Sequence, residues 1–273
     1  MDLLIRIQKA AIRKLVQHRW LLYQCQKARF LLFRGPFRDT LVRFFQKRSN
    51  TRSIALQGPS IFPELDVEQT LRELDTAGYS EAFLLAPAHI ESLFGFLSST
   101  GSKHVYQVHG RCRSFDEIAY DPKVVAVARR YIGAEPILYA SSLYLTGPDP
   151  KAKGIQAEKP ETEDLVHFDA NDFKDLNLFI YLNDVDQDTS PHFVIKRTHK
   201  EKSFRDLITL RYNRGEIDRR FPSGLETITG PAGFAFFEDT SCFHIQSVGA
   251  KGRYTASFCY TLQRSPKLAR YSS

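Results

Sequence analysis

Two histidines and one aspartate have the spacing of a metal site. A single residue separates His167 from Asp169, and His244 follows 75 residues after Asp169. Residues i and i+2 of an extended strand point to one face, so the side chains of His167 and Asp169 are expected to bind the same ion. Two imidazoles and one carboxylate on one face of an octahedral ion leave three positions open, as in iron(II) oxygenases. A structural zinc site would instead be closed by four ligands.

The segment after His244 strengthens this interpretation, because a His-x-Asp motif by itself arises by chance in many proteins. Arg253 begins a run in which small polar residues alternate with apolar or aromatic ones. The alternation places Arg253, Thr255 and Ser257 on one face of a strand. A guanidinium flanked by hydroxyls suits the distal carboxylate of a dicarboxylate, which arginine contacts through two hydrogen bonds. The alternative is that Arg253 begins an exposed strand and pairs with a surface acid.

Three further residues near these motifs offer metal-binding atoms. His192 and His199 lie in or just after a turn-forming segment, so we expect them to be surface or turn-stabilising residues. Cys242 precedes His244 by two positions and shares its face of an extended strand, where a small buried hydrophobic role is expected. None of the three is predicted to be a ligand.

The elements that must position these residues are predicted to form an antiparallel β domain in the second half of the chain. Short runs of aromatic and β-branched residues between turn residues indicate strands, and the chain contains 21 Phe and 12 Tyr. The predicted strands are 137–145, 176–182, 193–195, 227–229, 234–237 and 254–262. Residues 147–164 are polar and contain prolines, which suits a lid over a site better than a core element. Tyr139 and Tyr144 are candidate substrate-facing residues.

The first half is predicted to be mainly helical. Residues 67–74 are expected to form a helix ended by Gly78, followed by a strand at 83–85 and a helix from Ala88. Residues 123–131 have the strongest helix signals, with Pro122 at the first helical position and Gly133 beyond the end.

The N-terminal 50 residues are predicted to form a basic helical arm. Apolar residues recur at helical spacing over 3–33, Gly35-Pro36 interrupts them, and a shorter helix follows from Phe37 to Arg48. Residues 1–50 carry twelve Lys and Arg against two acidic residues, so this arm has a charge of +10 and the rest of the chain −3. One reading is an arm that binds a membrane surface or a partner through residues 1–48; the other is a helix docked on the domain. No nucleic-acid motif accompanies the charge, so nucleic acid is not expected as a partner.

Size and composition favour one catalytic domain. The 273 residues allow one full core plus an appendage, giving an arm over 1–50 and a domain over 51–273. The four cysteines are scattered, which argues against a zinc ribbon or a disulfide framework. No apolar run approaches the roughly eighteen residues needed to cross a bilayer, and the C-terminus lacks a peroxisomal Ser-Lys-Leu signal. A cytoplasmic protein is therefore expected, with peripheral membrane association if the arm binds a surface.

Taken together, several segments resemble the phytanoyl-CoA dioxygenase family of iron(II)- and 2-oxoglutarate-dependent oxygenases. The resemblance covers roughly residues 60–262. The segments that carry it are DPKVVAVARRYIGAEP, VHFDANDF, LNLFIYLNDVDQDTSPHFVIKRTHK and GPAGFAFFEDTSCFHIQSVGAKGRYTASF. The chain departs from the family at Thr189-Ser190-Pro191-His192, where many members have Gly-Gly, and in a slightly shorter interval between the distal histidine and the arginine.

The resemblance implies a fold and a set of site residues. The fold is a double-stranded β-helix, the cupin-like jelly roll, mainly β with flanking helices and here with the helical N-terminal extension. His167, Asp169 and His244 correspond to the iron ligands and Arg253 to the residue that holds 2-oxoglutarate. Thr255 matches a hydroxyl two places after that arginine, and Tyr181 falls where the family often has an aromatic residue near the co-substrate.

The reaction implied by the resemblance uses iron(II), 2-oxoglutarate and O₂ to hydroxylate an unactivated C–H of a small organic molecule, giving succinate and CO₂. Halogenating relatives replace the metal-binding carboxylate with a small residue, so Asp169 favours hydroxylation. Family members act on acyl-CoAs, amino acids, alkaloids and other natural products, so the family name does not identify a substrate. The alternative function is a catalytically silent jelly roll that binds a membrane or a partner through its basic N-terminal helix.

Overall fold

The structure is a computed structural model that describes residues 38–47, 53–81, 83–148, 166–169, 171–209, 211–222, 224–246 and 249–262. The predicted amphipathic helix over 3–33 lies outside the described residues, and so does most of the predicted lid over 147–164.

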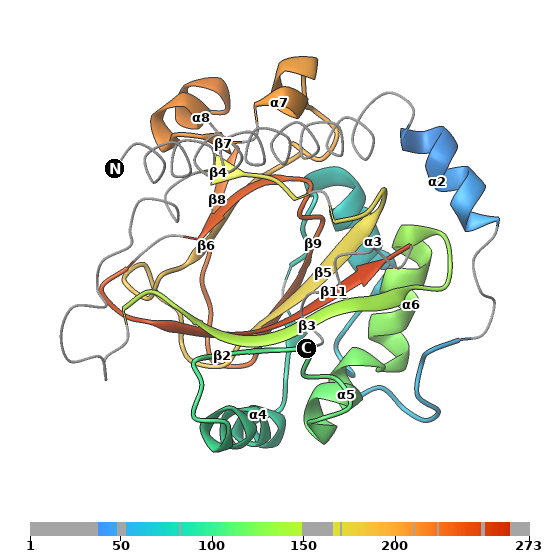
Figure 1. Ribbon diagram of the computed structural model, residues 1–273, viewed down its shortest axis with the longest axis vertical. Helices are drawn as coiled ribbons and strands as arrows, with labels where there is room; N and C mark the ends of the chain where they lie inside the picture. The colour runs from blue at the N-terminus through green and yellow to red at the C-terminus, as the bar shows by residue number, and fades with distance from the viewer. Residues whose placement is uncertain are drawn as a thin grey trace, which may run out of the picture.

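Two antiparallel sheets form the centre of the molecule (Figure 1). The larger sheet consists, in order across it, of β1 (Phe83–Leu84), β9 (Phe234–Glu238), β5 (Asp175–Tyr181), β11 (Arg253–Thr261), β3 (Ile137–Thr146) and β2 (His104–Tyr106). The smaller sheet consists of β7 (Arg211–Tyr212), β4 (Val166–His167), β10 (Phe243–Gln246), β6 (His192–Ile195) and β8 (Leu225–Ile228). Sequence neighbours are distributed between the two sheets, as in a double-stranded β-helix. The predicted jelly-roll fold is confirmed.

Helices cover the outer face of each sheet. On the side of the larger sheet lie α3 (Val67–Ala77), α4 (Pro87–Ser99), α5 (Arg113–Ala119) and α6 (Pro122–Ile132). The smaller sheet packs against α7 (Phe204–Ile208) and α8 (Arg214–Arg220), which lie together at the top of Figure 1. Among the described residues, every helix is too short or too polar to cross a lipid bilayer.

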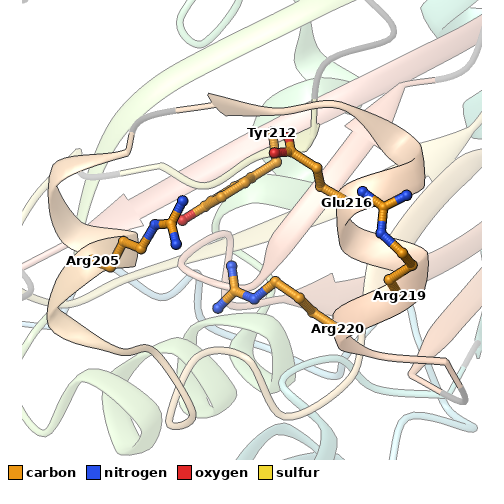
Figure 2. A pocket seen from close by; sticks show the side chains of 5 residues that line it. All are labelled: Arg205, Tyr212, Glu216, Arg219 and Arg220. Atoms are coloured by element: carbon orange, nitrogen blue, oxygen red, sulfur yellow. The ribbon is translucent and has the colours of Figure 1, made fainter.

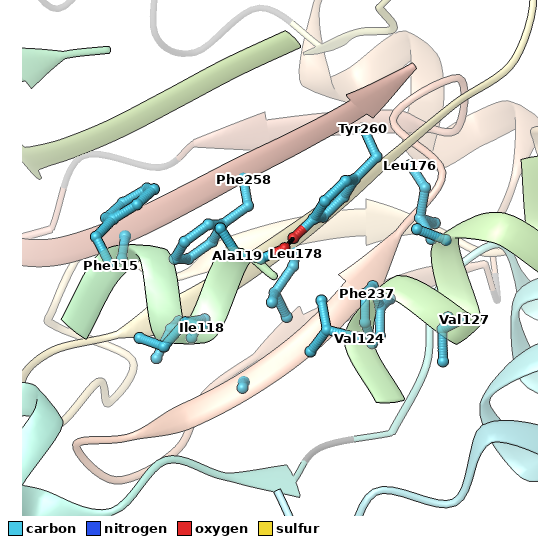
Figure 3. Close-up of a cluster of buried hydrophobic side chains, with 14 of the residues drawn as sticks. Phe115, Ile118, Ala119, Val124, Val127, Leu176, Leu178, Phe237, Phe258 and Tyr260 are labelled. Carbon is cyan, nitrogen blue, oxygen red and sulfur yellow. Dashed lines mark hydrogen bonds between the residues drawn. The ribbon is translucent and has the colours of Figure 1, made fainter. Parts of the chain in front are cut away.

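The main hydrophobic core lies between the larger sheet and its helices (Figure 3). Phe115 of α5 stacks on Phe258 of β11 with ring centroids 4.1 Å apart. The hydroxyl of Tyr260 donates to the carbonyl of Ala119 at 2.7 Å, which satisfies the one polar atom that this buried ring carries. Because Ala256, Phe258 and Tyr260 face the helices, the alternate residues of β11 face the smaller sheet.

The strongest sequence predictions for secondary structure are confirmed, and the shortest elements were missed. Helices α3, α4 and α6 and strands β1, β3, β5, β6, β8, β9 and β11 lie where they were expected, with ends shifted by a few residues. Gly78 ends α3 with a φ of 86°, and a Cβ there would lie 2.3 Å from the sulfur of Cys242, so only glycine fits. Elements that the sequence did not reveal are β2, β4, β7, β10, α5, α7 and α8.

The described part of the N-terminal arm is docked on the domain. Helix α2 (Arg38–Gln46) buries Val42, and Phe45 stacks on Phe173 with ring centroids 5.2 Å apart. Arg38 donates to the carbonyl of Phe173 at 2.7 Å, and Gln46 donates to that of Ile132 at 2.6 Å. Residues 38–46 are therefore held by the domain through apolar and polar contacts.

Asp121 connects the start of α6 to the segment before α3. Its buried carboxylate accepts from the backbone N–H groups of Lys123 and Val124 at 2.9 and 3.2 Å. It also accepts from the Ser60 hydroxyl at 2.9 Å and from the Ile61 N–H at 2.7 Å. One side chain thus satisfies donors of two segments that are distant in sequence.

Replacing Asp121 with alanine is expected to lower the free energy of unfolding by about 3 kcal/mol, because a helix cap is lost and buried donors are left unpaired. Urea denaturation of the two proteins measures the difference. Asp66→Ala is the matched control, since Asp66 caps α3 through one exposed hydrogen bond. If both variants lose the same free energy of unfolding, the contacts of Asp121 with Ser60 and Ile61 contribute nothing to stability.

Candidate active site

The structure brings the three predicted metal ligands together. The ligand atoms offered by His167, Asp169 and His244 all lie within 4.8 Å of one another. Strands β4 and β10 pair antiparallel with His167 directly opposite His244, and their ring centroids are 4.5 Å apart. No other group of three or more such residues in the described part of the chain has this arrangement. Two imidazoles and a carboxylate suit a divalent ion with positions left open.

The loop between β9 and β10 positions Asp169. The backbone N–H of Asp169 donates to the carbonyl of Thr240 at 2.7 Å. The Thr240 hydroxyl accepts from the side-chain amide of Asn177 at 2.9 Å. Asp239, next to Thr240, accepts from the hydroxyl of Tyr131 at 2.6 Å and so ties the loop to α6. Asp169 is therefore held by main-chain contacts to a loop that is itself anchored on the core.

His244 is oriented with one ring nitrogen available. Its Nδ1 lies 3.0 Å from the carbonyl of Cys242. A carbonyl oxygen only accepts, so Nδ1 carries the proton and Nε2 keeps its lone pair for an ion. Burial lowers the pKa of His244 to about 4, and the neighbouring His167 ring adds to this effect. The imidazole is thus kept neutral near pH 7, as a metal ligand must be.

Arg253 is buried, and its guanidinium has a hydrogen-bond donor without an acceptor. Arg253 is 1% exposed, and its Nε donates to the Thr255 hydroxyl at 3.1 Å. Its Nη1 is buried and has no hydrogen-bond partner. Such groups are rare because an unpaired buried donor is costly, and a charged one more so. The arrangement fits an anionic group that pairs with Nη1 when bound.

Tyr181 lies beside this guanidinium, as the sequence suggested. Thr255 and Tyr181 are paired across β11 and β5, and the Arg253 guanidinium carbon is 5.4 Å from the centre of the Tyr181 ring. Burial raises the pKa of Tyr181 to about 12, and its hydroxyl donates to the carbonyl of Ile228 at 2.9 Å. The Tyr181 ring is therefore neutral and held in one position beside Arg253.

His192 was expected to be a surface or turn-stabilising residue, and this prediction is wrong. The residue begins β6 and is 3% exposed, because β6 lies between β10 and β8 in the smaller sheet. Burial lowers the pKa of His192 well below its usual value, with contributions from Arg253 and His167. Its ring faces Phe179 of the larger sheet, with centroids 5.5 Å apart. His192 therefore lies in the barrel interior, between the two sheets.

Glu238 is a residue of this interior that sequence reasoning missed. It is the last residue of β9, pairs with Asn177, and is fully buried. Burial raises the pKa of Glu238 to about 7. The only sequence signal was an acidic residue at the end of an otherwise apolar strand.

The remaining residues singled out in the sequence are Tyr144, Tyr139, Cys242 and His199, and only some of them lie near the site. Tyr144 pairs with Thr255 across β3 and β11, which places it on the interior face, whereas Tyr139 lies at the register shift near Cys259. Cys242 is fully buried, as expected. His199 is half-buried in the turn after β6, with Nδ1 3.6 Å from the Cys242 sulfur.

A pocket rich in arginine lies outside the barrel, between α7 and α8 (Figure 2). It has a volume of about 250 Å³ and is lined by Arg205, Tyr212, Glu216, Arg219 and Arg220. Arg220 is neutralised by two hydrogen bonds of 2.7 and 2.9 Å to Asp206, and Glu216 is an acidic residue among the lining arginines. None of the predicted site residues belongs to it.

Comparisons with known proteins identify the fold. No family model of protein sequence matches the chain, and no curated protein sequence matches it. Among solved structures, the chain is similar to SnoN, a non-haem α-ketoglutarate-dependent epimerase from nogalamycin biosynthesis. The two are 14% identical with a TM-score of 0.55, and the match covers 71% of this chain and 82% of SnoN.

Two further structures have the same fold. EctD from S. alaskensis, solved with 2-oxoglutarate and 5-hydroxyectoine, is 16% identical with a TM-score of 0.51, covering 78% of this chain and 85% of that chain. HygX from Streptomyces hygroscopicus, solved with nickel and 2-oxoglutarate, is 14% identical with a TM-score of 0.52, covering 72% and 87%. At these identities the similarity establishes the jelly-roll fold and not the chemistry.

Proposed function

We propose that this protein is a non-haem iron(II)- and 2-oxoglutarate-dependent oxygenase. The observation that carries the proposal is the convergence of His167, Asp169 and His244 within 4.8 Å, in a barrel that also buries Arg253 with an unpaired Nη1. A divalent ion and a dicarboxylate are the two ligands that these groups lack. The fold supports the same conclusion, since EctD and HygX, which share it, were solved with 2-oxoglutarate bound.

The residues present fit these groups. His167 and His244 would supply neutral imidazole nitrogens and Asp169 a carboxylate oxygen, a donor set suited to iron(II). When bound, iron(II) supplies the activation of O₂ that lets an unactivated C–H be oxidised while 2-oxoglutarate is converted to succinate and CO₂.

The protein's own residues bind and orient the co-substrate. Arg253 would pair with its distal carboxylate, Thr255 holds the guanidinium in place, and Tyr181 excludes water from one side of that ion pair.

We propose hydroxylation of a small organic substrate as the reaction. Asp169 supports this choice, because it provides the carboxylate that the resemblance associates with hydroxylases. SnoN is an epimerase, so the shared fold also serves other outcomes of C–H oxidation. Tyr144, which lies on the interior face of β3, is the described residue that we propose to contact the substrate.

An anaerobic absorption measurement tests the metal and co-substrate together. Adding iron(II) and 2-oxoglutarate is expected to produce a weak visible charge-transfer band, absent with either alone. In air, a panel of acyl-CoAs, amino acids and natural products is then assayed for succinate above the substrate-free rate. A wild-type chain that shows no band and forms no succinate would support the catalytically silent alternative.

A further inference from the structure

Glu238 and His192 place an acid and an imidazole side by side in the barrel interior. Oε2 of Glu238 lies 2.7 Å from Nε2 of His192. The contact lies outside regular hydrogen-bond geometry, and Nε2 of His192 is itself a buried atom with no hydrogen-bond partner. The exposed fractions of the two residues are 0% and 3%, so water does not compensate the cost of burying them.

The pair is in contact with a predicted metal ligand. Oε1 of Glu238 lies 3.6 Å from Nδ1 of His244, the ring nitrogen that donates to the Cys242 carbonyl. The His192 ring lies nearly parallel to the His244 ring, at an angle of 24° with centroids 5.7 Å apart. His244 is thus bordered by Glu238 and His192 as well as by the Cys242 carbonyl.

The hydrogen-bonding capacity of Glu238 is not used up by these contacts. Both of its carboxyl oxygens are buried, and neither has a partner in regular hydrogen-bond geometry. Unsatisfied acceptors in a protein interior require an explanation, such as a role toward a bound ion. The His244 ring, whose Nδ1 lies 3.6 Å from Oε1, is a neighbouring group on which such an ion would place positive charge.

We propose that Glu238, in contact with His192, is a positioning residue that strengthens metal binding by His244. The inference rests on the proposed function. An ion bound at Nε2 draws electron density from the imidazole and makes Nδ1–H a stronger donor. A carboxyl oxygen 3.6 Å from Nδ1 stabilises the positive charge that the ring then carries, while the Cys242 carbonyl accepts the hydrogen bond and fixes the orientation of the ring. Contacts of this kind are expected to change metal affinity by about 10-fold or more.

Cobalt(II) binding tests this role without any need for a substrate. Glu238→Gln and Glu238→Leu are expected to weaken the Kd for cobalt(II) by about 10-fold and to shift its visible d–d bands. His192→Phe keeps an aromatic ring beside His244 but removes the contact with Glu238, and a smaller loss of affinity is expected. Circular dichroism of each variant without metal confirms that it is folded.

The matched control is Glu135→Gln. Glu135 is also a largely buried carboxylate, with a side chain that is 7% exposed, and it pairs with Arg129 at 2.6 Å far from the three ligands in sequence. Its variant is expected to bind cobalt(II) like the wild type. If both Glu238 variants bind cobalt(II) as tightly as the wild type, the role of Glu238 is refuted while the metal site stands. Failure of the wild type to bind the ion would instead overturn the proposed function.

Discussion

Replacing His167 with alanine is expected to abolish succinate formation and to weaken iron(II) binding by at least about 100-fold. Loss of an outer partner of a metal ligand already costs about 10- to 100-fold in affinity, and His167 is predicted to be a ligand itself. It lies opposite His244 in the β4–β10 pair, so its removal takes away one of two converging imidazoles. Equilibrium dialysis with metal analysis gives the affinity, and a succinate assay gives the turnover.

His199→Ala is the matched control for this prediction. His199 is a half-buried histidine whose Nε2 lies 3.2 Å from the carbonyl of Asp75, and it is not part of the ligand group. Its variant is expected to keep wild-type iron content. A His167→Ala protein that retains both iron and turnover would contradict the assignment of the ligands.

Replacing Arg253 with methionine is expected to raise the KM for 2-oxoglutarate by about 100-fold or more. Truncating one partner of a buried, hydrogen-bonded charge pair costs about 2–5 kcal/mol, and about 1.4 kcal/mol is a factor of ten. Arg253→Lys keeps the charge but loses the planar pair of donors, so an intermediate value is expected. Steady-state kinetics with varied 2-oxoglutarate gives the KM of each variant.

Thermal unfolding separates this binding role from a structural one. Without 2-oxoglutarate, Arg253→Met is not expected to lower the Tm, because the guanidinium is buried with Nη1 unpaired. Added 2-oxoglutarate should raise the Tm of the wild type but not that of Arg253→Met. Arg220→Met is the control, since Arg220 already has a carboxylate partner in Asp206 and should affect Tm but not KM. An unchanged KM in Arg253→Met would show that the co-substrate binds elsewhere.

Local signals in the sequence were sufficient for the main elements and for the predicted ligand set. Asp121, Pro122 and Gly133 mark the ends of α6 through interactions within a few residues. The alternation after Arg253 depends only on strand geometry. The i, i+2 spacing selected His167 and Asp169 correctly as neighbours, although β4 ends at His167 and Asp169 lies beyond the strand. Helix ends and strand alternation are determined within a single segment of the sequence, so they could be predicted without knowing which segments pack beside it. The pairing partner of each segment was not available from such signals.

Tertiary structure decided which polar residues are buried and which of them meet. β4 has two residues and β10 four, too few to show a periodic pattern. They become strands because each pairs with two neighbours in the smaller sheet, β4 with β7 and β10, and β10 with β4 and β6. The turn-like sequence before His192 concealed its burial, which results from strands on both sides of β6. Glu238 likewise meets His192 and His244 because two sheets face each other. Burial and contact of this kind depend on which strands are neighbours, a property of the folded chain as a whole.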